Sequence, residues 1–454
     1  MTTQIDSHQL EYFKKLTDAI NNDDIDGFRN AFLMLHPYDQ AQYFLSLNGN
    51  ERYRIYTYLS PRETSYFFEH LELDEQKRYI SEMDPSYASS MLASMYVDNA
   101  VDILNELDKS QVESYLAMMD KDVASEIKQV LHYEEKTAGS IMTTEYVSIE
   151  AHQTVEEAMQ KLRNEAPTAE TIYYIYVIDK MKKLVGVISL RDLIIADKND
   201  TIADHMSDFV VSVSVSDDQE EVAKLMRDYD FLALPVVDFQ GRLAGIITHD
   251  DIADVIDEEA SDDYSKIAGL IDVDDIDKNP FSAAKKRLPW LIVLLFLGML
   301  TASLIGRFEA TLERVAILAV FLPLIAGMAG NTGTQSLAVV IRRIATGDIE
   351  DENKWRMVLR EAGTGIITGA VCGALIVGIV YIWKHSLILG VLVGFSLFCT
   401  LIVATVSGAM IPLVMQKLKI DPAVASGPFI QTLNDILSVL IYFGLATTFM
   451  NYLL

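Results

Sequence analysis

Five long apolar segments fill most of the chain after residue 287, and they constrain its fold more than any other feature. They cover residues 288–305, 315–341, 358–383, 387–415 and 428–452. Each has roughly the 20 residues that a helix needs to cross a bilayer. Because unpaired backbone groups are costly in lipid, the sequence predicts a transmembrane domain of five helices over residues 288–454.

Basic residues are unevenly distributed around these segments. Ten flank the ends that would lie on one side of the membrane, and three flank the other ends. The ten are Lys285, Lys286, Arg287, Arg342, Arg343, Lys354, Arg356, Arg360, Lys417 and Lys419, and the three are Arg307, Arg314 and Lys384. Since cytoplasmic loops are rich in Lys and Arg, we predict a multi-pass protein of the cytoplasmic membrane, with its N-terminus in the cytoplasm and its C-terminus outside. The polar N-terminus predicts no cleavable signal peptide.

The net negative charge of the chain lies before the apolar segments. Residues 288–454 hold 10 basic and 9 acidic residues, and the whole chain has a net charge of −28, so residues 1–287 carry −29. This sign argues against nucleic acid as a partner, because phosphate binding needs positive charge. It favours cations, although an acidic surface also serves solubility. Cys372 and Cys399 lack metal-ligand spacing, so neither a disulfide framework nor a zinc site is expected.

Residues 1–130 contain a repeat of constant period. Leu35-His36-Pro37 has counterparts that begin at Leu59, Met83 and Leu107, each time before a polar turn and an apolar-aromatic stretch. Such a period predicts an all-α superhelical domain of stacked helical hairpins. Asp98 and Asp102 are four positions apart, which places both carboxylates on one helical face. From these two residues alone, a solvated face is the simpler interpretation.

Residues 131–260 contain a second repeat. Strands expected at 172–178 and 184–189 have counterparts at 232–237 and 243–248, and the Glu156-Glu157 pair of the preceding helix has its counterpart at Glu220-Glu221. The offset between the two copies is larger for the helices than for the strands. The first copy therefore carries five extra residues between its first helix and its last strand. The alternation of strands and helices predicts two small α/β units. The segment resembles a tandem of CBS domains over most of its length.

Both copies end in a Ser/Thr-x-x-Asp element, formed by Ser189 and Asp192 in the first and by Thr248 and Asp251 in the second. In the CBS family this element often contacts the ribose of an adenine nucleotide. The resemblance therefore implies ATP as a candidate ligand of these four residues. Helix capping by Ser189 and Thr248 is the equally weighted alternative.

A dense run of eight carboxylates follows, with no basic residue among them. They are Asp250, Asp251, Asp254, Asp257, Glu258, Glu259, Asp262 and Asp263. Oxygen ligands suit a hard divalent cation such as Mg²⁺ or Ca²⁺. A charge run is usually a solvated face. This one precedes the predicted membrane domain, with residues 261–287 as the connecting segment, and that position favours a regulatory site.

The last apolar segment carries Asp435 near its middle. A carboxylate at that depth costs at least about 3 kcal/mol on insertion scales and more often marks an ion path than a satisfied interior group. Gln431, Ser438 and Tyr442 share its helical face, with Asn434 beside them, so this polar stripe must face protein or water.

Two other apolar segments depart from a uniform membrane anchor. Pro323 and the polar residues after it predict irregular backbone in the second segment. Gly365, Gly369 and Gly373 predict close helix packing or dimerisation in the third.

Several motifs together resemble the signature of the MgtE family of magnesium channels and transporters. They are residues 323–336 (PLIAGMAGNTGTQS), 408–412 (GAMIP), 421–423 (DPA), 426–428 (SGP) and Asn434-Asp435. With the helical repeat and the CBS pair in the same order, the resemblance covers essentially the whole chain. It implies a homodimer with one Mg²⁺ pathway at its two-fold axis, lined by the second and fifth membrane helices. Asp435 would be the pore carboxylate, supported by Gly327, Asn331, Gln335, Gly427, Gln431 and Asn434.

The resemblance also implies regulatory Mg²⁺ ligands in the soluble half, and a connecting helix within 261–287 that gates the pore. These ligands would be Asp98, Asp102, Asp218, Asp230, Asp251, Asp254, Glu259, Asp262 and Asp263, with Asp250 and Glu258 as substitutes of adjacent register. Asn99 departs from the family, which often has an acid there. The implied function is Mg²⁺ uptake that cytoplasmic Mg²⁺ shuts off. Two alternatives remain, a membrane-anchored CBS sensor that transports nothing and an ion-coupled divalent-cation carrier. We expect no enzyme, because no nucleophile has a base at usable spacing.

Overall fold

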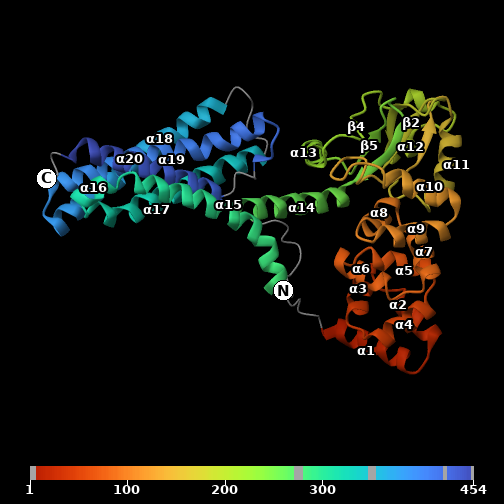
Figure 1. Cartoon of the computed structure of the whole chain (residues 1–454). Helices are drawn as coiled ribbons and strands as arrows, with labels where there is room; N and C mark the ends of the chain where they lie inside the picture. Colours follow the sequence, from red (N-terminus) through yellow and green to blue (C-terminus); the bar gives the residue numbers. More distant parts are fainter. Residues whose placement is uncertain (1–6, 270–279, 346–353, 423–426, 451–454) are drawn as a thin grey trace. The chain divides into compact units, whose positions relative to one another are not determined.

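The computed structural model describes residues 7–269, 280–345, 354–422 and 427–450 (Figure 1). The chain divides into two compact units, residues 1–256 and residues 257–454. The first holds ten short helices followed by two small sheets, and the second holds the long apolar helices.

The ten short helices repeat with the predicted period. They are α1 Ser7–Asn21, α2 Ile25–Phe32, α3 Pro37–Leu45, α4 Gly49–Tyr58, α5 Pro61–Phe68, α6 Leu73–Ile80, α7 Pro85–Leu92, α8 Val97–Asn105, α9 Lys109–Met118 and α10 Lys121–Val130. From α3 on, alternate helices begin at the constant spacing of the sequence repeat. The residue before the helix supplies the N-cap, as Ser60 and Asp84 do for α5 and α7, and proline at the first helical position fits the fixed φ of that site.

Stacking of successive repeats buries one continuous core. Helix α3 contacts α5, α5 contacts α7 and α7 contacts α9, while α6, α8 and α10 form the second row. Phe28, Phe44 and Phe67 are among its fully buried side chains. The predicted superhelix of stacked hairpins is therefore confirmed.

Two three-stranded sheets with the same topology follow. The first contains β1 Ser148–Glu150, β2 Tyr174–Ile178 and β3 Leu184–Ser189, and the second contains β4 Val213–Ser214, β5 Ala233–Val237 and β6 Leu243–Thr248. In each sheet the first strand is parallel to the second and the second is antiparallel to the third. The accompanying helices are α11 Val155–Glu165, α12 Leu190–Ile195, α13 Gln219–Tyr229, α14 His249–Ile267 and the short 3₁₀ helix η1 Ile202–Asp204.

The two sheets have equivalent registers, as the constant offset of the strands predicts. Tyr174 pairs with Ser189 in the first sheet, and Ala233 pairs with Thr248 in the second. The five extra residues of the first copy lie between α11 and β2. Both predicted α/β units are thus present.

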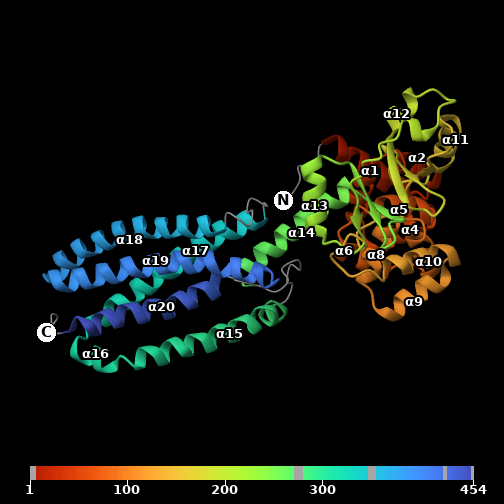
Figure 2. The same cartoon turned by 90° about the horizontal axis from the view of Figure 1, so that it is seen from above.

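The second unit is a bundle of long helices (Figure 2). It contains α15 Pro280–Gly306, the short α16 Glu309–Arg314, α17 Leu318–Ala345, α18 Lys354–Lys384, α19 Leu387–Lys417 and α20 Gly427–Thr448. Five of these are long and apolar enough to cross a membrane. Helix α19 packs against α17, α18 and α20, and α15 contacts α20.

Close packing in the bundle depends on glycine. A Cβ atom at Gly369 would lie 3.0 Å from the Phe398 carbonyl oxygen of α19, and one at Gly373 would lie 2.7 Å from that of Gly394. The predicted glycine ridge of the third segment therefore serves packing of α18 on α19 inside one chain. One prediction for the second segment is wrong: α17 continues as one helix through Pro323, because packing on α19 and α20 holds it. The connecting segment 261–287 lies partly outside the described residues.

Candidate cation sites

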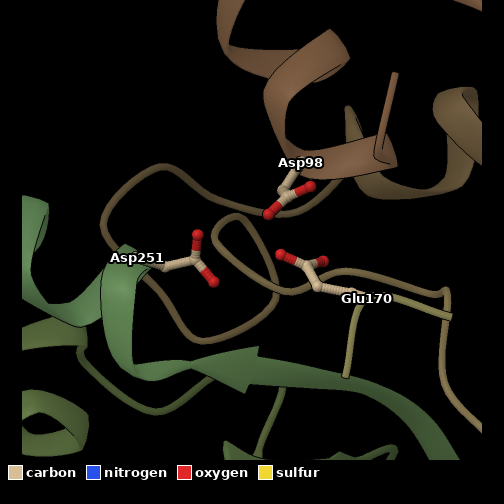
Figure 3. Close-up of side chains that lie close together, drawn as sticks. All are labelled: Asp98, Glu170 and Asp251. Atoms are coloured by element: carbon tan, nitrogen blue, oxygen red, sulfur yellow. The ribbon is translucent and has the colours of Figure 1, made fainter. Parts of the chain in front are cut away.

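Three carboxylates from distant parts of the sequence converge in the first unit. Asp98 lies in the first turn of α8, Asp251 in the first turn of α14, and Glu170 in the loop before β2. One oxygen from each lies within 4.8 Å of the others, and Figure 3 shows the three groups pointing toward one another. We call Asp98, Glu170 and Asp251 the acidic triad. The helical repeat and the CBS pair thus meet at an acidic site.

Burial makes charge on the triad costly. It raises the pKa of Glu170 to about 8, with the Asp251 charge as the second cause. Burial also raises the pKa of Asp251 to about 6, against hydrogen bonds from Thr248 that lower it. The pKa of Asp98, which is 4 % exposed, lies well above its usual range for the same reason. One oxygen of Asp98 and one of Glu170 are buried without a hydrogen-bond partner among the described residues. Unpaired buried carboxylate oxygens suit a hard divalent cation.

Neighbouring loop residues hold the triad in place. The Glu170 N–H donates to the Glu145 carbonyl oxygen at 2.9 Å, which ties the loop before β2 to the segment before β1. The Glu145 carboxylate accepts from the Thr143 hydroxyl at 2.6 Å and from the Thr144 N–H at 3.0 Å. Burial raises the pKa of Glu145 as well, so a fourth acid lies beside the triad.

The triad differs from the pair of acids that the sequence suggested, Asp98 and Asp102. Asp102 shares the helix of Asp98 but is exposed, and it is not one of the three converging groups. Sequence reasoning missed Glu170, since a single acid in a loop has no periodic signal. Asp218 and Asp230 lie at the two ends of α13, where Asp218 caps the helix and Asp230 ends it with a left-handed φ of 54°. Asp254 is exposed on α14, and its charge contributes to the raised pKa of Asp251.

A second group of charges lies in the second unit, where α14 ends. Lys266 Nζ is 2.7 Å from an Asp421 oxygen and 3.7 Å from one of Asp262. Burial raises the pKa of Asp263, and the charge of Asp421 is the next cause. Glu259 also acts on Asp263 in this way. The sequence pointed to the acids of α14 as cation ligands, but to Asp421, in the loop before α20, only as part of the motif at residues 421–423.

Two acidic residues lie within the five candidate spans, and they differ in their surroundings. Glu361 of α18 is buried and accepts a hydrogen bond from the Ser336 hydroxyl at 3.0 Å. Asp435 of α20 is half-buried, and no hydrogen bond or ion pair to its carboxylate is found among the described residues. Glu361 is therefore a satisfied interior group, while Asp435 is open to a ligand.

The polar residues near Asp435 divide into an open set and a packed set. Asn331 and Gln335 of α17 and Gln431 of α20 are exposed, and a Cβ atom at Gly327 would meet open space. The packed set contains Asn434, Ser438, Tyr442 and Gly427. The Asn434 side chain is 1 % exposed and accepts from the Ser407 hydroxyl at 2.7 Å, so in the protomer it joins α20 to α19 and does not face the open side. Gly427 packs near Thr334 of α17.

The four residues predicted to contact a nucleotide, Ser189, Asp192, Thr248 and Asp251, have different hydrogen bonds in the two copies. Ser189 accepts from the Asp192 N–H at 3.1 Å and so caps α12, as the alternative interpretation predicts. Ser189 also lines a pocket of about 560 Å³ together with Tyr173, Tyr174, Leu190, Arg191, Ile194, Ile195 and Leu232. Thr248 instead donates its hydroxyl to Asp250 and Asp251 at 2.6 and 2.5 Å. The Thr248 N–H donates to an Asp251 oxygen at 3.0 Å, which is the return bond of a capping box at the start of α14, whereas no hydrogen bond from a backbone N–H to the Thr248 hydroxyl oxygen is found among the described residues.

Comparison with known proteins decides the family. The model of the MgtE family, described as a divalent cation transporter, matches residues 322–445. The models of the MgtE intracellular N domain and of the CBS domain match residues 35–136 and residues 138–199 and 202–258. The magnesium transporter MgtE of Enterococcus faecalis is 54 % identical over 444 residues, which cover 97 % of this chain and 98 % of that protein. The chain belongs to the MgtE family.

Two solved structures support the same assignment for the first unit. The soluble part of a magnesium transporter is 54 % identical, with a TM-score of 0.54, and the match covers 56 % of this chain and 99 % of that one. The cytosolic domain of the Mg²⁺ channel MgtE in complex with ATP is 39 % identical, with a TM-score of 0.51, and the match covers 54 % of this chain and 99 % of that one. The order of a helical N domain, a CBS pair and a multi-pass membrane domain is thus that of the MgtE family.

Proposed function

We propose that the protein transports Mg²⁺ across the cytoplasmic membrane along a path lined by α17 and α20. The observation that carries this proposal is Asp435, a half-buried carboxylate of a membrane helix that has no protein partner among the described residues. An uncompensated charge at that depth is costly unless a cation or water meets it. The relative from Enterococcus faecalis, which matches nearly the whole chain, is a magnesium transporter.

The residues around Asp435 suit a hydrated ion. Mg²⁺ gives up its water reluctantly, so a path for it should offer acceptors to bound water instead of replacing that water. The exposed amides of Asn331, Gln335 and Gln431 can make such hydrogen bonds. In the proposed homodimer, two copies of Asp435 face one path, and their combined charge selects divalent over monovalent cations. The N-terminus then lies in the cytoplasm, as the basic loops favour.

Cytoplasmic Mg²⁺ closes this path in our proposal. When Mg²⁺ is scarce, the carboxylates of the acidic triad repel one another, and so do the acids at the end of α14. When it is abundant, bound ions favour the arrangement in which these carboxylates are close. A ligand shifts such an equilibrium only through its different affinity for the two states, and a site that needs several carboxylates together provides that difference. An ion-coupled carrier would use the same residues and differs in its dependence on a second ion.

ATP is a second candidate ligand, at the pocket beside Ser189. Two tyrosines and Arg191 line it, which suits stacking on a base and contact with phosphates. A related cytosolic domain binds ATP. We propose nucleotide binding at this pocket alone, because Thr248 and Asp251 are engaged with each other and with the triad.

Mg²⁺ flux into liposomes tests the main proposal. The wild-type protein is compared with Asp435→Asn, and with Glu361→Gln as a matched control, since an amide at 361 can still accept from Ser336. We expect flux in the wild type and in the control, and none in Asp435→Asn. Raising Mg²⁺ on the side of the soluble half should stop the flux. Undiminished flux in Asp435→Asn would contradict the proposed path.

A further inference from the structure

Two turns of the CBS pair lie side by side at the ends of their hairpins. One joins β2 to β3 (residues 179–183) and the other joins β5 to β6 (residues 238–242); together we call them the turn pair. The Leu184 N–H donates to the Gly241 carbonyl oxygen at 3.1 Å, and the Leu243 N–H donates to that of Lys182 at 3.0 Å. Lys183 faces Arg242 in an antiparallel bridge. The two turns therefore form one continuous surface.

This surface is basic, although residues 1–287 carry a charge of −29. Lys180, Lys182, Lys183 and Arg242 are all exposed, and none forms an ion pair within the described ranges. The same turns contain Asp179 and Asp238. Each of these carboxylates accepts two backbone N–H groups of its own turn, at 2.7 to 2.9 Å, and so serves to shape the turn.

Each turn also exposes a large apolar side chain beside the cations. Met181 is 63 % exposed and Phe239 is 84 % exposed. They project singly from two turn tips. Binding at the headgroup region of a bilayer gains from buried apolar area and from attraction between basic residues and anionic lipid, and the turn pair offers both kinds of group.

The backbone at Lys182 adds an independent observation. Lys182 has a φ of 63°, and Gly241, which occupies the same place in the second copy, has a φ of 76°. This left-handed region favours glycine and disfavours residues with a Cβ atom. The first copy thus has a lysine at a backbone conformation that favours glycine, the residue found in the second copy.

We propose that the turn pair docks on the anionic lipid headgroups of the membrane in which the chain is anchored. The acidic remainder of the first unit is repelled by an anionic leaflet, whereas the turn pair is attracted to it. The chain tethers the first unit to the membrane covalently, because residues 257–282 join its last residue, Ile256, to Ala283, the start of the first candidate span. An acidic protein is the less favoured occupant, because two separate apolar tips offer it no groove. This inference goes beyond transport and does not depend on it.

Fluorescence of the full chain in lipid nanodiscs tests the proposal. Cys372→Ala and Cys399→Ala provide a background in which Gln240→Cys, at an exposed position of the turn pair, takes an environment-sensitive dye. The protein is reconstituted with phosphatidylcholine alone or with phosphatidylglycerol added. We expect a blue-shifted emission and weaker quenching by aqueous iodide only in the anionic discs. The shift should disappear at about 1 M salt, where charge interactions are screened beyond about 3 Å.

Charge variants separate lipid docking from other effects. Reversal of the four cations of the turn pair should abolish the lipid-dependent shift. A matched reversal of four exposed cations elsewhere in the first unit should preserve it; this control is Lys109→Glu, Lys121→Glu, Lys128→Glu and Arg163→Glu. Lys182→Gly suits the backbone at this position and should weaken docking about fivefold, the contribution of one basic residue near an anionic leaflet.

Three outcomes would overturn the proposal. Equal dye signals in neutral and anionic discs would exclude anionic lipid as the occupant. A shift produced by soluble glycerol phosphate without anionic lipid in the disc would indicate a site for free phosphate. Equal loss in both fourfold variants would show that overall charge, and not this surface, governs the signal.

Discussion

Asp98 and Asp251 each lie in the first turn of a helix, and this position sets the charge balance of the acidic triad. The positive end of a helix dipole favours a carboxylate by about 0.3–1 kcal/mol at exposed sites. Burial of Asp98 opposes its ionisation, and Glu170 adds a third negative group within 4.8 Å. Two helix termini do not neutralise one buried and two half-buried carboxylates. A divalent cation would pair with the carboxylate oxygens that the protein leaves without a hydrogen bond.

Asp98→Asn should therefore change the response of the first unit to Mg²⁺. Removal of a buried, unsatisfied charge should stabilise this region without Mg²⁺ by about 1–3 kcal/mol. It should also weaken the protection of backbone amides that Mg²⁺ gives. A site with one carboxylate fewer binds Mg²⁺ less tightly, and a weakly bound ion stabilises the folded state less. Hydrogen exchange of residues 96–105 in the full chain, with and without Mg²⁺, measures both effects. Asp102→Asn is the comparison and should keep most of the Mg²⁺ response; equal loss in both variants would restore the pair that the sequence suggested.

A second residue-scale prediction concerns Asp421, which Lys266 holds at 2.7 Å. If Asp421 contributes a carboxylate to Mg²⁺-dependent closure, Asp421→Asn should raise the Mg²⁺ concentration that stops flux about tenfold, within the usual range of coupling between sites. Lys266→Gln removes the ion pair but keeps the carboxylate, so closure by Mg²⁺ should persist. Liposome flux at stepped internal Mg²⁺ measures this. If Lys266→Gln were the more damaging change, the ion pair would be the element that closes the path.

Some site residues could be predicted from sequence, and others could not, for a physical reason. Asp435 could be predicted because an acidic residue is unusual within a long apolar segment. Glu170 and Asp421 lie in loops, where an acid is ordinary, and only the fold brings them to Asp98 and to the end of α14. Asn434 looked like its neighbour Asp435, but one residue along a helix turns a side chain by about 100° and places it against α19.

At the scale of elements, α17 is held between two neighbours by glycine. A Cβ atom at Gly333 would collide with the Asn434 side chain of α20, and one at Gly408 of α19 would collide with the Gly333 carbonyl oxygen. The helix that carries Asn331 and Gln335 therefore has its position fixed from both sides. Any shift of α17 would move these amides relative to Asp435.

Gly408→Ala tests this packing. The added methyl group meets backbone, which cannot move aside as a flexible side chain does, so we expect a loss of about 1–3 kcal/mol and reduced flux. Gly363→Ala is the control, since a Cβ atom there meets nothing within 4 Å. In a helix interior that change should be neutral or stabilising by up to about 1 kcal/mol. Thermal stability of the purified protein distinguishes the two variants, and equal stability would refute the packing argument.

Element patterns were predicted where they repeat. The constant period of the helical repeat showed where α3 to α10 begin, and the constant offset of the strands showed that β2 and β3 are equivalent to β5 and β6. The continuity of α17 was not predictable in this way. Pro323 lies near its start, and two of its glycines, Gly330 and Gly333, are the places where α20 and α19 approach.

At the scale of the whole molecule, the acidic excess lies in the half of the chain that precedes the membrane helices. The membrane unit keeps two acids inside the candidate spans, one satisfied by Ser336 and one open, while the acidic excess lies in residues 1–287. In the proposed function, the regulatory sites and the ion path would therefore use the same chemistry, carboxylate oxygen for a hard ion, one in water and one in the membrane.

The open face of α17 and α20 predicts where two copies meet. A face with Asn331, Gln335 and Gln431 exposed in an apolar helix bundle is unstable against lipid, and a second copy would enclose it. In the background Cys372→Ala, Cys399→Ala, we expect Asn331→Cys to form cross-links between copies in membranes. Leu375→Cys, at a position of α18 that is 61 % exposed and apolar, should not, because that side chain suits lipid. Cross-linked dimers on denaturing gels measure the difference. Efficient cross-linking at residue 375 but not at 331 would place the two-fold axis at α18 and leave Asp435 without a second carboxylate opposite it.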